Sequence, residues 1–248
     1  MKGQVIGVEA YNPPNSDRTN ADLTKGLIAV KGQGIVDAID LHGGTADTAH
    51  PTYSRGDFST SEPGGDNFCN VPTLTVAEQN LPFVPEVPPT GDPDAGPDAF
   101  DPGAPAIPAQ DIKYAWSNIK IIVKPTGLGN QLVGDLTYTT DTSEDGGAPT
   151  HCEATYRVRA LFPQIPCEHP ATDAGPATPD FCQCLPYADP ANGRALGSGI
   201  QPDLFGPQPP PSAACELSPA NATALEAAAR VACDPDLHMC VLKAEPTN

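Results

Sequence analysis

Short apolar runs separated by turn-forming segments characterise the N-terminal third of the chain. The runs are Val5–Val8, Leu27–Leu41 and Leu74–Val76. Runs of this length between Asn-, Pro- and Gly-rich segments are typical of β-strands. Gly32 and Gly34 interrupt the second run, which indicates a bulge or a tight bend. The pattern therefore predicts a β-rich N-terminal part over residues 1–81.

Residues 112–163 show the most regular alternation of apolar and polar positions. The alternating apolar residues are Ile119, Ile121 and Val123 in one run and Ala154, Tyr156, Val158 and Ala160 in another. A further run lies between them at Leu132–Thr140, and Gly-containing segments at 127–130 and 144–147 suit hairpin turns. We therefore predict an antiparallel β meander that shares its core with the N-terminal part. The fold class is mainly β, with an antiparallel, sandwich-like core.

Proline dominates the segment between these two parts. Residues 82–108 hold nine Pro in 27 positions. Because Pro cannot donate to a β-ladder and holds its predecessor in an extended conformation, residues 82–111 are predicted to form a stiff, polyproline-like linker. The whole chain has 31 Pro and 23 Gly, which disfavours a mainly helical fold and indicates long Pro-rich loops.

The last part, residues 164–248, combines Cys- and Pro-rich loops with one helix signal. Ser218 can cap a helix, Pro219 suits its first turn, and an Ala-rich run follows. We predict a short C-terminal helix over about 219–232 and a last short strand at His238–Leu242.

Eight cysteines are spread over the chain. They are Cys69, Cys152, Cys167, Cys182, Cys184, Cys215, Cys233 and Cys240. An even number of cysteines among loops is typical of a disulfide-stapled exported protein, so we expect all eight to be bridged. The spacing permits a small loop closed by Cys233 and Cys240 and a bridge from Cys215 to Cys182 or Cys184, and it disfavours Cys152 with Cys167. The connectivity stays open.

The N-terminal segment shows no signal peptide, because its apolar run is too short. We therefore expect that the numbered chain is a mature or recombinant form whose leader was removed, together with a lipid-bearing cysteine that the original N-terminus could have carried. The other alternative is a cytosolic protein whose cysteines are thiols or metal ligands.

The charge of the chain is strongly negative and uneven. The formal net charge is −18, and the span between Gly56 and Ile112 holds ten carboxylates without one Lys or Arg. Nucleic-acid binding is disfavoured because phosphate contacts need a concentrated positive surface. The sequence also lacks the run of about 20 apolar residues that a transmembrane helix requires.

Four aspartates in the acidic span are candidates for calcium ligands. They are Asp92, Asp94, Asp98 and Asp101. Carboxylate oxygens suit calcium, but an EF-hand loop that opens at Asp92 would need Gly and Glu where Pro97 and Gly103 stand. A solvated acidic linker is the favoured interpretation.

Two further groups of residues could carry metal or catalytic chemistry. Histidine lies beside cysteine at 151–152, 167–169 and 238–240, and with Cys182 and Cys184 these residues could bind zinc or copper. Asp40, His42, Asp47 and His50 surround a Gly pair and approach a catalytic cluster. The spacings match no zinc motif, and no nucleophile elbow, phosphate loop or dinucleotide motif occurs. A non-enzymatic protein without a cofactor is therefore favoured.

Three stretches carry a resemblance to a known class of proteins. They are residues 152–163, Gly197–Asp203 and the Asp-, Pro-, Ala- and Gly-rich segment Asp94–Asp98. Together they resemble uncharacterised exported lipoproteins of the Gram-negative bacterial envelope. This resemblance implies a periplasmic, outer-membrane-associated or extracellular location, and it assigns no functional residue.

The function predicted from the sequence is that of a structural or accessory subunit with protein partners in an envelope or extracellular assembly. Long Pro-rich segments can lie along a partner as pre-extended chain. Two alternatives remain: a module that binds calcium or a basic partner through the acidic span between residues 56 and 112, and a metalloenzyme that uses the His and Cys groups.

Overall fold

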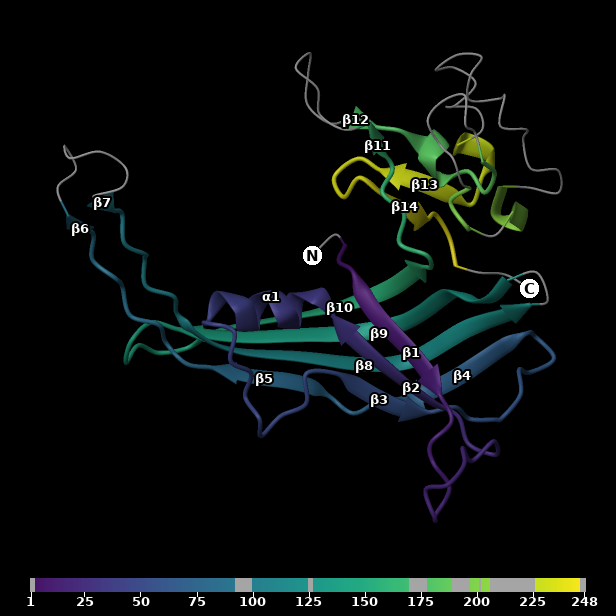
Figure 1. The fold of residues 1–248 in the computed structure, drawn as a ribbon, viewed down its shortest axis with the longest axis horizontal. Coiled ribbons are helices and arrows are strands. Elements are labelled where there is room, and N and C mark those ends of the chain that lie inside the picture. The colour runs from purple at the N-terminus through teal and green to yellow at the C-terminus, as the bar shows by residue number, and fades with distance from the viewer. Residues whose placement is uncertain are drawn as a thin grey trace. The chain divides into compact units, whose positions relative to one another are not determined.

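The computed structural model describes residues 3–91, 100–124, 127–169, 178–188, 197–200, 202–205 and 226–245. These residues form antiparallel sheets with few helices, which confirms the mainly β prediction (Figure 1). The strands of the two larger sheets, given in chain order with helix α1, are β1 Ile6–Tyr11, β2 Leu27–Gly32, α1 Gln33–Leu41, β3 Ser54–Asp57, β4 Phe68–Thr73, β5 Ala77–Leu81, β8 Ala109–Lys124, β9 Gly127–Ser143 and β10 Thr150–Leu161.

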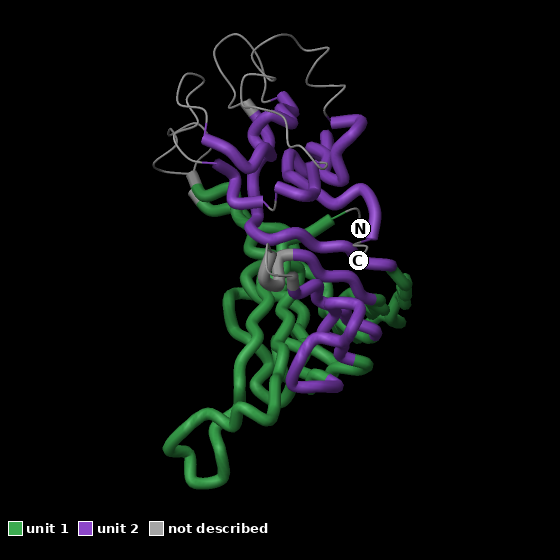
Figure 2. Tube along the Cα trace, turned by 90° about the vertical axis from the view of Figure 1, so that its right-hand side faces the viewer, with its two compact units in different colours: residues 1–58, 72–117, 135–156 green, residues 59–71, 118–134, 157–248 purple. Residues whose placement is uncertain are grey.

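The chain folds into two compact units that share several strands. Unit 1 comprises Met1–Phe58, Pro72–Ser117 and Asp135–Tyr156, and unit 2 comprises Ser59–Val71, Asn118–Gly134 and Arg157–Asn248 (Figure 2). Strands β4, β8, β9 and β10 therefore contribute residues to both units. The described part of the chain contains no helix long and apolar enough to cross a membrane.

A three-stranded antiparallel sheet with the order β1-β2-β3 opens unit 1. The first apolar run of the sequence lies at β1, as predicted. One face of the sheet is buried by Ile28, Val30 and Ser54, which are at most 1% exposed.

Helix α1 corrects the prediction of a strand over Leu27–Leu41. Only the first six residues of this run are strand, and the helix begins at Gln33. Its buried residues, Ile35, Ala38 and Ile39, follow the i, i+3, i+4 spacing of one helical face. Gly34 is required where the buried Tyr114 hydroxyl approaches, because a Cβ atom there would lie 2.4 Å from that oxygen.

The large sheet has the order β10-β9-β8-β4, and β5 also pairs with β8. This arrangement confirms the predicted meander of three antiparallel strands. The third apolar run, Leu74–Val76, is not a strand; it connects β4 to β5.

The alternation along β8 changes phase at Asn118. Tyr114 and Trp116 are buried before it, whereas Ile119 and Ile121 are buried after it. Asn118 has a φ of 51°, the left-handed conformation that Asn tolerates better than most residues. A local irregularity of this kind changes which alternate positions along a strand are buried.

The C-terminal part of unit 2 is built from short elements around one small core. These are β11 Glu168–His169, β12 Thr178–Pro179, the 3₁₀ helices η1 Phe181–Cys184 and η3 Pro202–Phe205, β13 Val231–Asp234 and β14 Met239–Leu242. The buried residues are Cys167, Phe181, Cys184, Leu185, Ile200, Leu204, Phe205, Ala229, Val231, Cys233, Cys240 and Leu242. Strand β14 confirms the predicted last strand.

The predicted C-terminal helix over 219–232 is wrong at its end. Residues 219–225 lie outside the described residues, 226–228 are helical, and Val231 begins β13. Val231 and Cys233 are buried against β14, opposite Leu242 and Cys240. Packing of these side chains overrides the helix propensity of the preceding alanines.

Candidate interaction surface

The Pro-rich segment forms a two-legged arm on unit 1 rather than a linker between two parts. We call residues 84–91 and 100–107 the arm. Its legs continue the antiparallel pairing of β5 with β8, and they end at β6 Thr90–Gly91 and β7 Phe100–Asp101 (Figure 1). The chain therefore leaves unit 1 along one leg and returns along the other.

The two legs are paired at every third residue. Val84 faces Ile107, Val87 faces Ala104, and Thr90 faces Asp101. In the first two pairs the residues exchange both backbone hydrogen bonds, each with an N···O distance of 2.9 Å. Pro has no N–H, and extended polyproline returns the same side to the partner after three residues. The spacing of the non-proline residues therefore allows pairing where an ordinary ladder, with a period of two, would fail.

Gly103 fixes the geometry of the returning leg. Its φ is 70°, and a Cβ atom there would lie 2.1 Å from the carbonyl oxygen of Val87 and 2.8 Å from the nitrogen of Pro89. The Gly103 N–H donates to the Asp101 carboxylate at 2.9 Å. Only glycine allows the legs to approach this closely.

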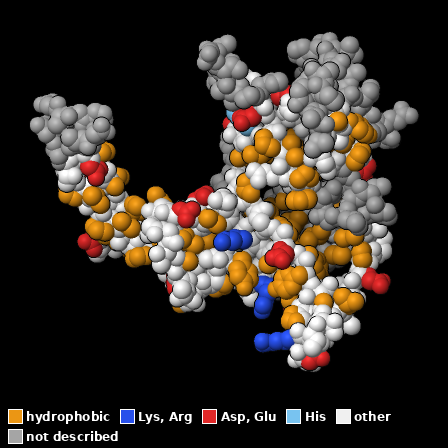
Figure 3. Space-filling view, in the orientation of Figure 1, with side chains coloured by type: hydrophobic (Ala, Val, Ile, Leu, Met, Phe, Trp, Pro, Cys, Tyr) orange, Lys and Arg blue, Asp and Glu red, His pale blue; other side chains and the backbone are white. Residues whose placement is uncertain are grey.

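The side chains of the arm are largely exposed. Val87 is 50% exposed, and its neighbours Glu86 and Pro88 are also exposed. Figure 3 shows hydrophobic side chains along the arm interrupted by acidic ones. The arm therefore combines apolar and acidic side chains on a backbone whose own hydrogen bonds hold it extended.

Only one of the four calcium candidates lies within the described part of the chain. Asp92, Asp94 and Asp98 lie outside it. Asp101 is described, and its carboxylate accepts the Gly103 N–H. The prediction of a calcium site at these four aspartates stays a prediction.

The predicted cluster around the Gly pair is divided between two structural roles. His42 is buried and its ring nitrogens lie 2.7 Å from the Ala38 oxygen and 2.9 Å from the Pro108 oxygen, so it joins α1 to the base of the arm. Asp40 is exposed and carries no interaction with this ring.

Asp47 and His50 form a separate polar pair beside β5. The His50 Nδ1 lies 2.6 Å from the Asp47 carboxylate, whose hydrogen bond raises the pKa of His50 and lowers that of Asp47. The Gln79 side chain accepts the Asp47 N–H at 2.8 Å and donates to the Asp47 and His50 carbonyl oxygens. Because Gln79 is fully buried, these bonds anchor the loop to the sheet. The Asp47–His50 pair is therefore explained by its role in holding this loop, and no nucleophilic side chain takes part in these hydrogen bonds.

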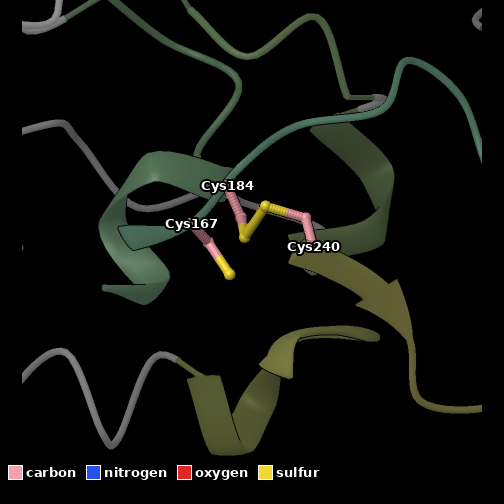
Figure 4. A group of neighbouring side chains, drawn as sticks. All are labelled: Cys167, Cys184 and Cys240. Carbon is pink, nitrogen blue, oxygen red and sulfur yellow. A yellow bond between two sulfur atoms is a disulfide. The ribbon is translucent and has the colours of Figure 1, made fainter. Parts of the chain in front are cut away.

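The cysteines of unit 2 form a buried sulfur cluster. Cys167 is bonded to Cys233 and Cys184 to Cys240. The sulfur atoms of Cys167, Cys184 and Cys240 lie within 4.8 Å of one another (Figure 4). Three thiolates at such distances could hold a metal ion, but sulfur atoms in disulfides are not thiolate ligands.

The remaining cysteines differ in state. Cys182 is disulfide-bonded, and Cys215 lies outside the described residues. Cys69 and Cys152 are free, which differs from the expectation that all eight are bridged, and burial raises the pKa of the Cys69 thiol. The proposed small loop is also wrong: Cys233 and Cys240 face each other across β13 and β14, but each is bonded elsewhere.

Two of the three histidines beside these cysteines lie against carboxylates, and the side chain of His169 is outside the described part of the structure. His151 Nδ1 lies 2.7 Å from Asp141, and His238 Nδ1 lies 2.7 Å from Glu168. Among the residues that the structure describes, no histidine joins the sulfur cluster. The predicted His and Cys motifs therefore do not converge on one centre there.

Comparison with known families gives a match over most of the chain: the profile of the MlpA family covers residues 1–163. The chain belongs to the MlpA family. A curated relative, described as "Putative lipoprotein MlpA" from Myxococcus xanthus, is 25% identical over 96 residues. These residues are 39% of this chain and 30% of that protein, so the chain spans about a third of its relative. No solved structure matches significantly.

The MlpA match places the candidate features in two groups. It includes the three-stranded sheet, the arm and the Asp47–His50 pair, and it ends before the sulfur cluster, whose first member is Cys167. The features that belong to the MlpA region are therefore those of an exposed, paired arm on a β-sheet, not those of a cysteine centre.

Proposed function

We propose that the chain is a non-enzymatic, envelope-associated accessory subunit that contacts a protein partner through the Pro-rich arm. Two comparisons support the class. The chain belongs to the MlpA family, and its relative from Myxococcus xanthus is described as "Putative lipoprotein MlpA". A lipid anchor, and a location at the periplasm, the outer membrane or the cell exterior, belong to the same proposal.

The observation that carries this proposal is the exposed arm with its own backbone pairing. Four backbone hydrogen bonds, together with the pairing of β6 with β7, hold the two legs together, so the arm is extended before any partner binds. Pre-extended chain loses less conformational entropy on binding than a flexible loop does. The half-exposed Val87 supplies an apolar contact at the middle of the first leg.

The chemistry of the partner follows from the charge around the arm. The described legs carry Glu86 and Asp101, and the connecting residues between them add Asp92, Asp94 and Asp98 in the sequence, with no Lys or Arg. Charge complementarity favours a partner with a basic surface and makes association sensitive to salt. A calcium-binding role for the same aspartates is the second candidate, and a rise in thermal stability at millimolar calcium would support it.

The test is site-specific photo-crosslinking in the native host. A photoreactive amino acid replaces Val87 in the arm, and in a matched control it replaces Leu23, which is 75% exposed elsewhere on unit 1. We expect Val87 to give one defined crosslinked product in the membrane-associated fraction, lost at high salt, and Leu23 to give none. Equal products from both positions, or none from Val87, would contradict the proposal.

A further inference from the structure

Strand β1 has an open edge that its sheet does not use. The Gln33 N–H donates to the Val5 oxygen at 2.9 Å in register with the β1–β2 pairing. In an antiparallel ladder the hydrogen-bonded pairs alternate, so the odd-numbered residues of β1 point their backbone groups toward β2. Ile6, Val8 and Ala10 therefore direct their N–H and C=O groups away from the sheet.

The opposite edge of the sheet is covered, which makes the open edge of β1 distinctive. At β3, the Arg55 oxygen accepts the Thr75 N–H at 2.8 Å, and the Arg55 N–H donates to the Thr75 hydroxyl at 2.9 Å. Within the described residues, no hydrogen bond takes up the outward groups of Ile6, Val8 or Ala10. Val8 is 44% exposed there. Unpaired edges of this kind pair readily with another strand.

We propose that β1 pairs antiparallel with β1 of a second copy of this chain, about a twofold axis at Val8. This register places Val8 opposite Val8 of the second copy and Ile6 opposite its Ala10. Each of these pairs exchanges backbone hydrogen bonds, so all the outward groups of the three residues are satisfied. Such a contact is isologous and closes as a dimer, in which the two sheets become one.

The side chains of β1 select this register. On the outer face it places Tyr11 opposite Val5, an aromatic and β-branched pair that is favourable across strands. A shift of the axis to Glu9 would place two glutamates opposite each other, which is unfavourable. A shift to Gly7 would pair fewer residues of the strand and place the two glycines together.

Charge complementarity supports a second copy as the occupant. Glu9 and Lys31 both line a groove of about 490 Å³ on the outer face, and neither has an ion-pair partner among the described residues. Lys31 lies beside Gly7 in the β1–β2 register. In the proposed dimer Glu9 of the second copy lies on the other side of Gly7, about 10 Å from Lys31 by two strand spacings. Because Gly7 has no side chain, the two long side chains can meet above it.

The test measures the association of the full chain by sedimentation velocity from about 10 µM to 1 mM, a range chosen because one strand pair buries less than the standard interface of about 1,600 Å². We expect a concentration-dependent dimer. Val8→Pro removes an outward N–H without affecting the bonds to β2, so it should abolish the dimer. Glu9→Lys and Lys31→Glu should each weaken it at least about tenfold, and the double variant should restore it. Glu62 is exposed and lies far from β1 in the sequence, so Glu62→Lys is the matched control.

A second measurement keeps the test valid if Val8→Pro misfolds. In the unmodified chain, hydrogen exchange at Ile6, Val8 and Ala10 should slow as the protein concentration rises. A chain that is monomeric at 1 mM, a dimer that survives Val8→Pro, or exchange at β1 that is independent of concentration would overturn the proposal. Arm variants should leave the dimer unchanged, which separates this result from the test of the proposed function.

Discussion

Replacement of Gly103 by Ala tests the period-three pairing of the arm. Alanine at a φ of 70° costs about 1 to 2 kcal/mol in backbone conformation alone. The added Cβ would also lie 2.1 Å from the Val87 oxygen, a contact with backbone that only separation of the legs relieves. We therefore expect a total cost above about 2 kcal/mol, concentrated in the arm. Since about 1.4 kcal/mol corresponds to a factor of ten, local opening should become at least about 30-fold more frequent.

The assay is amide hydrogen exchange at the four paired residues of the arm. Val84, Val87, Ala104 and Ile107 donate the N–H groups that join the legs. In Gly103→Ala their exchange should accelerate together, because each bond depends on the same approach of the legs. Exchange in the buried strands should stay unchanged, since the arm is largely exposed.

Gly146→Ala provides the matched control. Gly146 has a φ of 67°, nearly that of Gly103, but a Cβ atom there meets nothing within 4 Å. Its cost is the backbone preference alone, about 1 to 2 kcal/mol, so exchange near the β9–β10 turn should rise by no more than about 30-fold. Equal effects of the two variants, or unchanged exchange in the arm of Gly103→Ala, would refute the close pairing of the legs.

Three further predictions concern bonds that hold the units together internally. Cys184→Ala with Cys240→Ala removes a crosslink between residues separated by 56 positions, and should lower the free energy of unfolding by about 2 to 4 kcal/mol in chemical denaturation; a loss below about 1 kcal/mol would contradict this. Asp47→Asn should lower the pKa of His50 toward 6.5 in an NMR titration. In the unmodified chain the raised pKa of His50 stabilises the folded state fully below pH 6.5, and this contribution is lost as the pH rises through that raised pKa. The lowered pKa of Asp47 stabilises the folded state above pH 3.8, so the pair should contribute most to the free energy of unfolding between these two pH values. If the free energies of unfolding of the two proteins differed by the same amount at every pH, this reasoning would be wrong. Arg157→Ala breaks a half-exposed ion pair to the C-terminal tail, so stability should fall by less than about 1 kcal/mol while the tail becomes more sensitive to carboxypeptidase; an unchanged cleavage rate would exclude this role.

The parts of the fold that the sequence predicts well are those where a local pattern and the core agree. In β10, Tyr156 and Val158 are half-buried while Arg157 and Arg159 are exposed, as the alternation predicts. In Leu27–Leu41 two patterns compete: the continuous apolar run suits a buried strand, and the spacing of its second half suits one face of a helix. The spacing of Ile35, Ala38 and Ile39 was the available signal for the helix.

The pairing of the arm's two legs shows why other parts of the fold were not predictable from local sequence patterns. Prolines predict extended chain, which the legs are, but whether two legs pair depends on contacts between residues as distant as Val84 and Ile107. The spacing of Val84, Val87 and Thr90 by three residues was the signal that could have indicated pairing. Cysteine connectivity needs the same long-range information, because Cys233 and Cys240 lie opposite each other and are nevertheless bonded to other partners.

The two proposed contacts of unit 1 differ in the groups that they leave for a partner, and this difference separates them experimentally. The arm uses the N–H groups of its paired residues within itself, and its prolines have none, so a partner must recognise mainly side chains. Their acidic character makes that contact weaken steeply with salt. Strand β1 presents unused backbone groups, and backbone pairing is insensitive to salt apart from the contribution of Glu9 and Lys31. An association that survives high salt but not Val8→Pro therefore belongs to β1, and one that survives Val8→Pro but not high salt belongs to the arm.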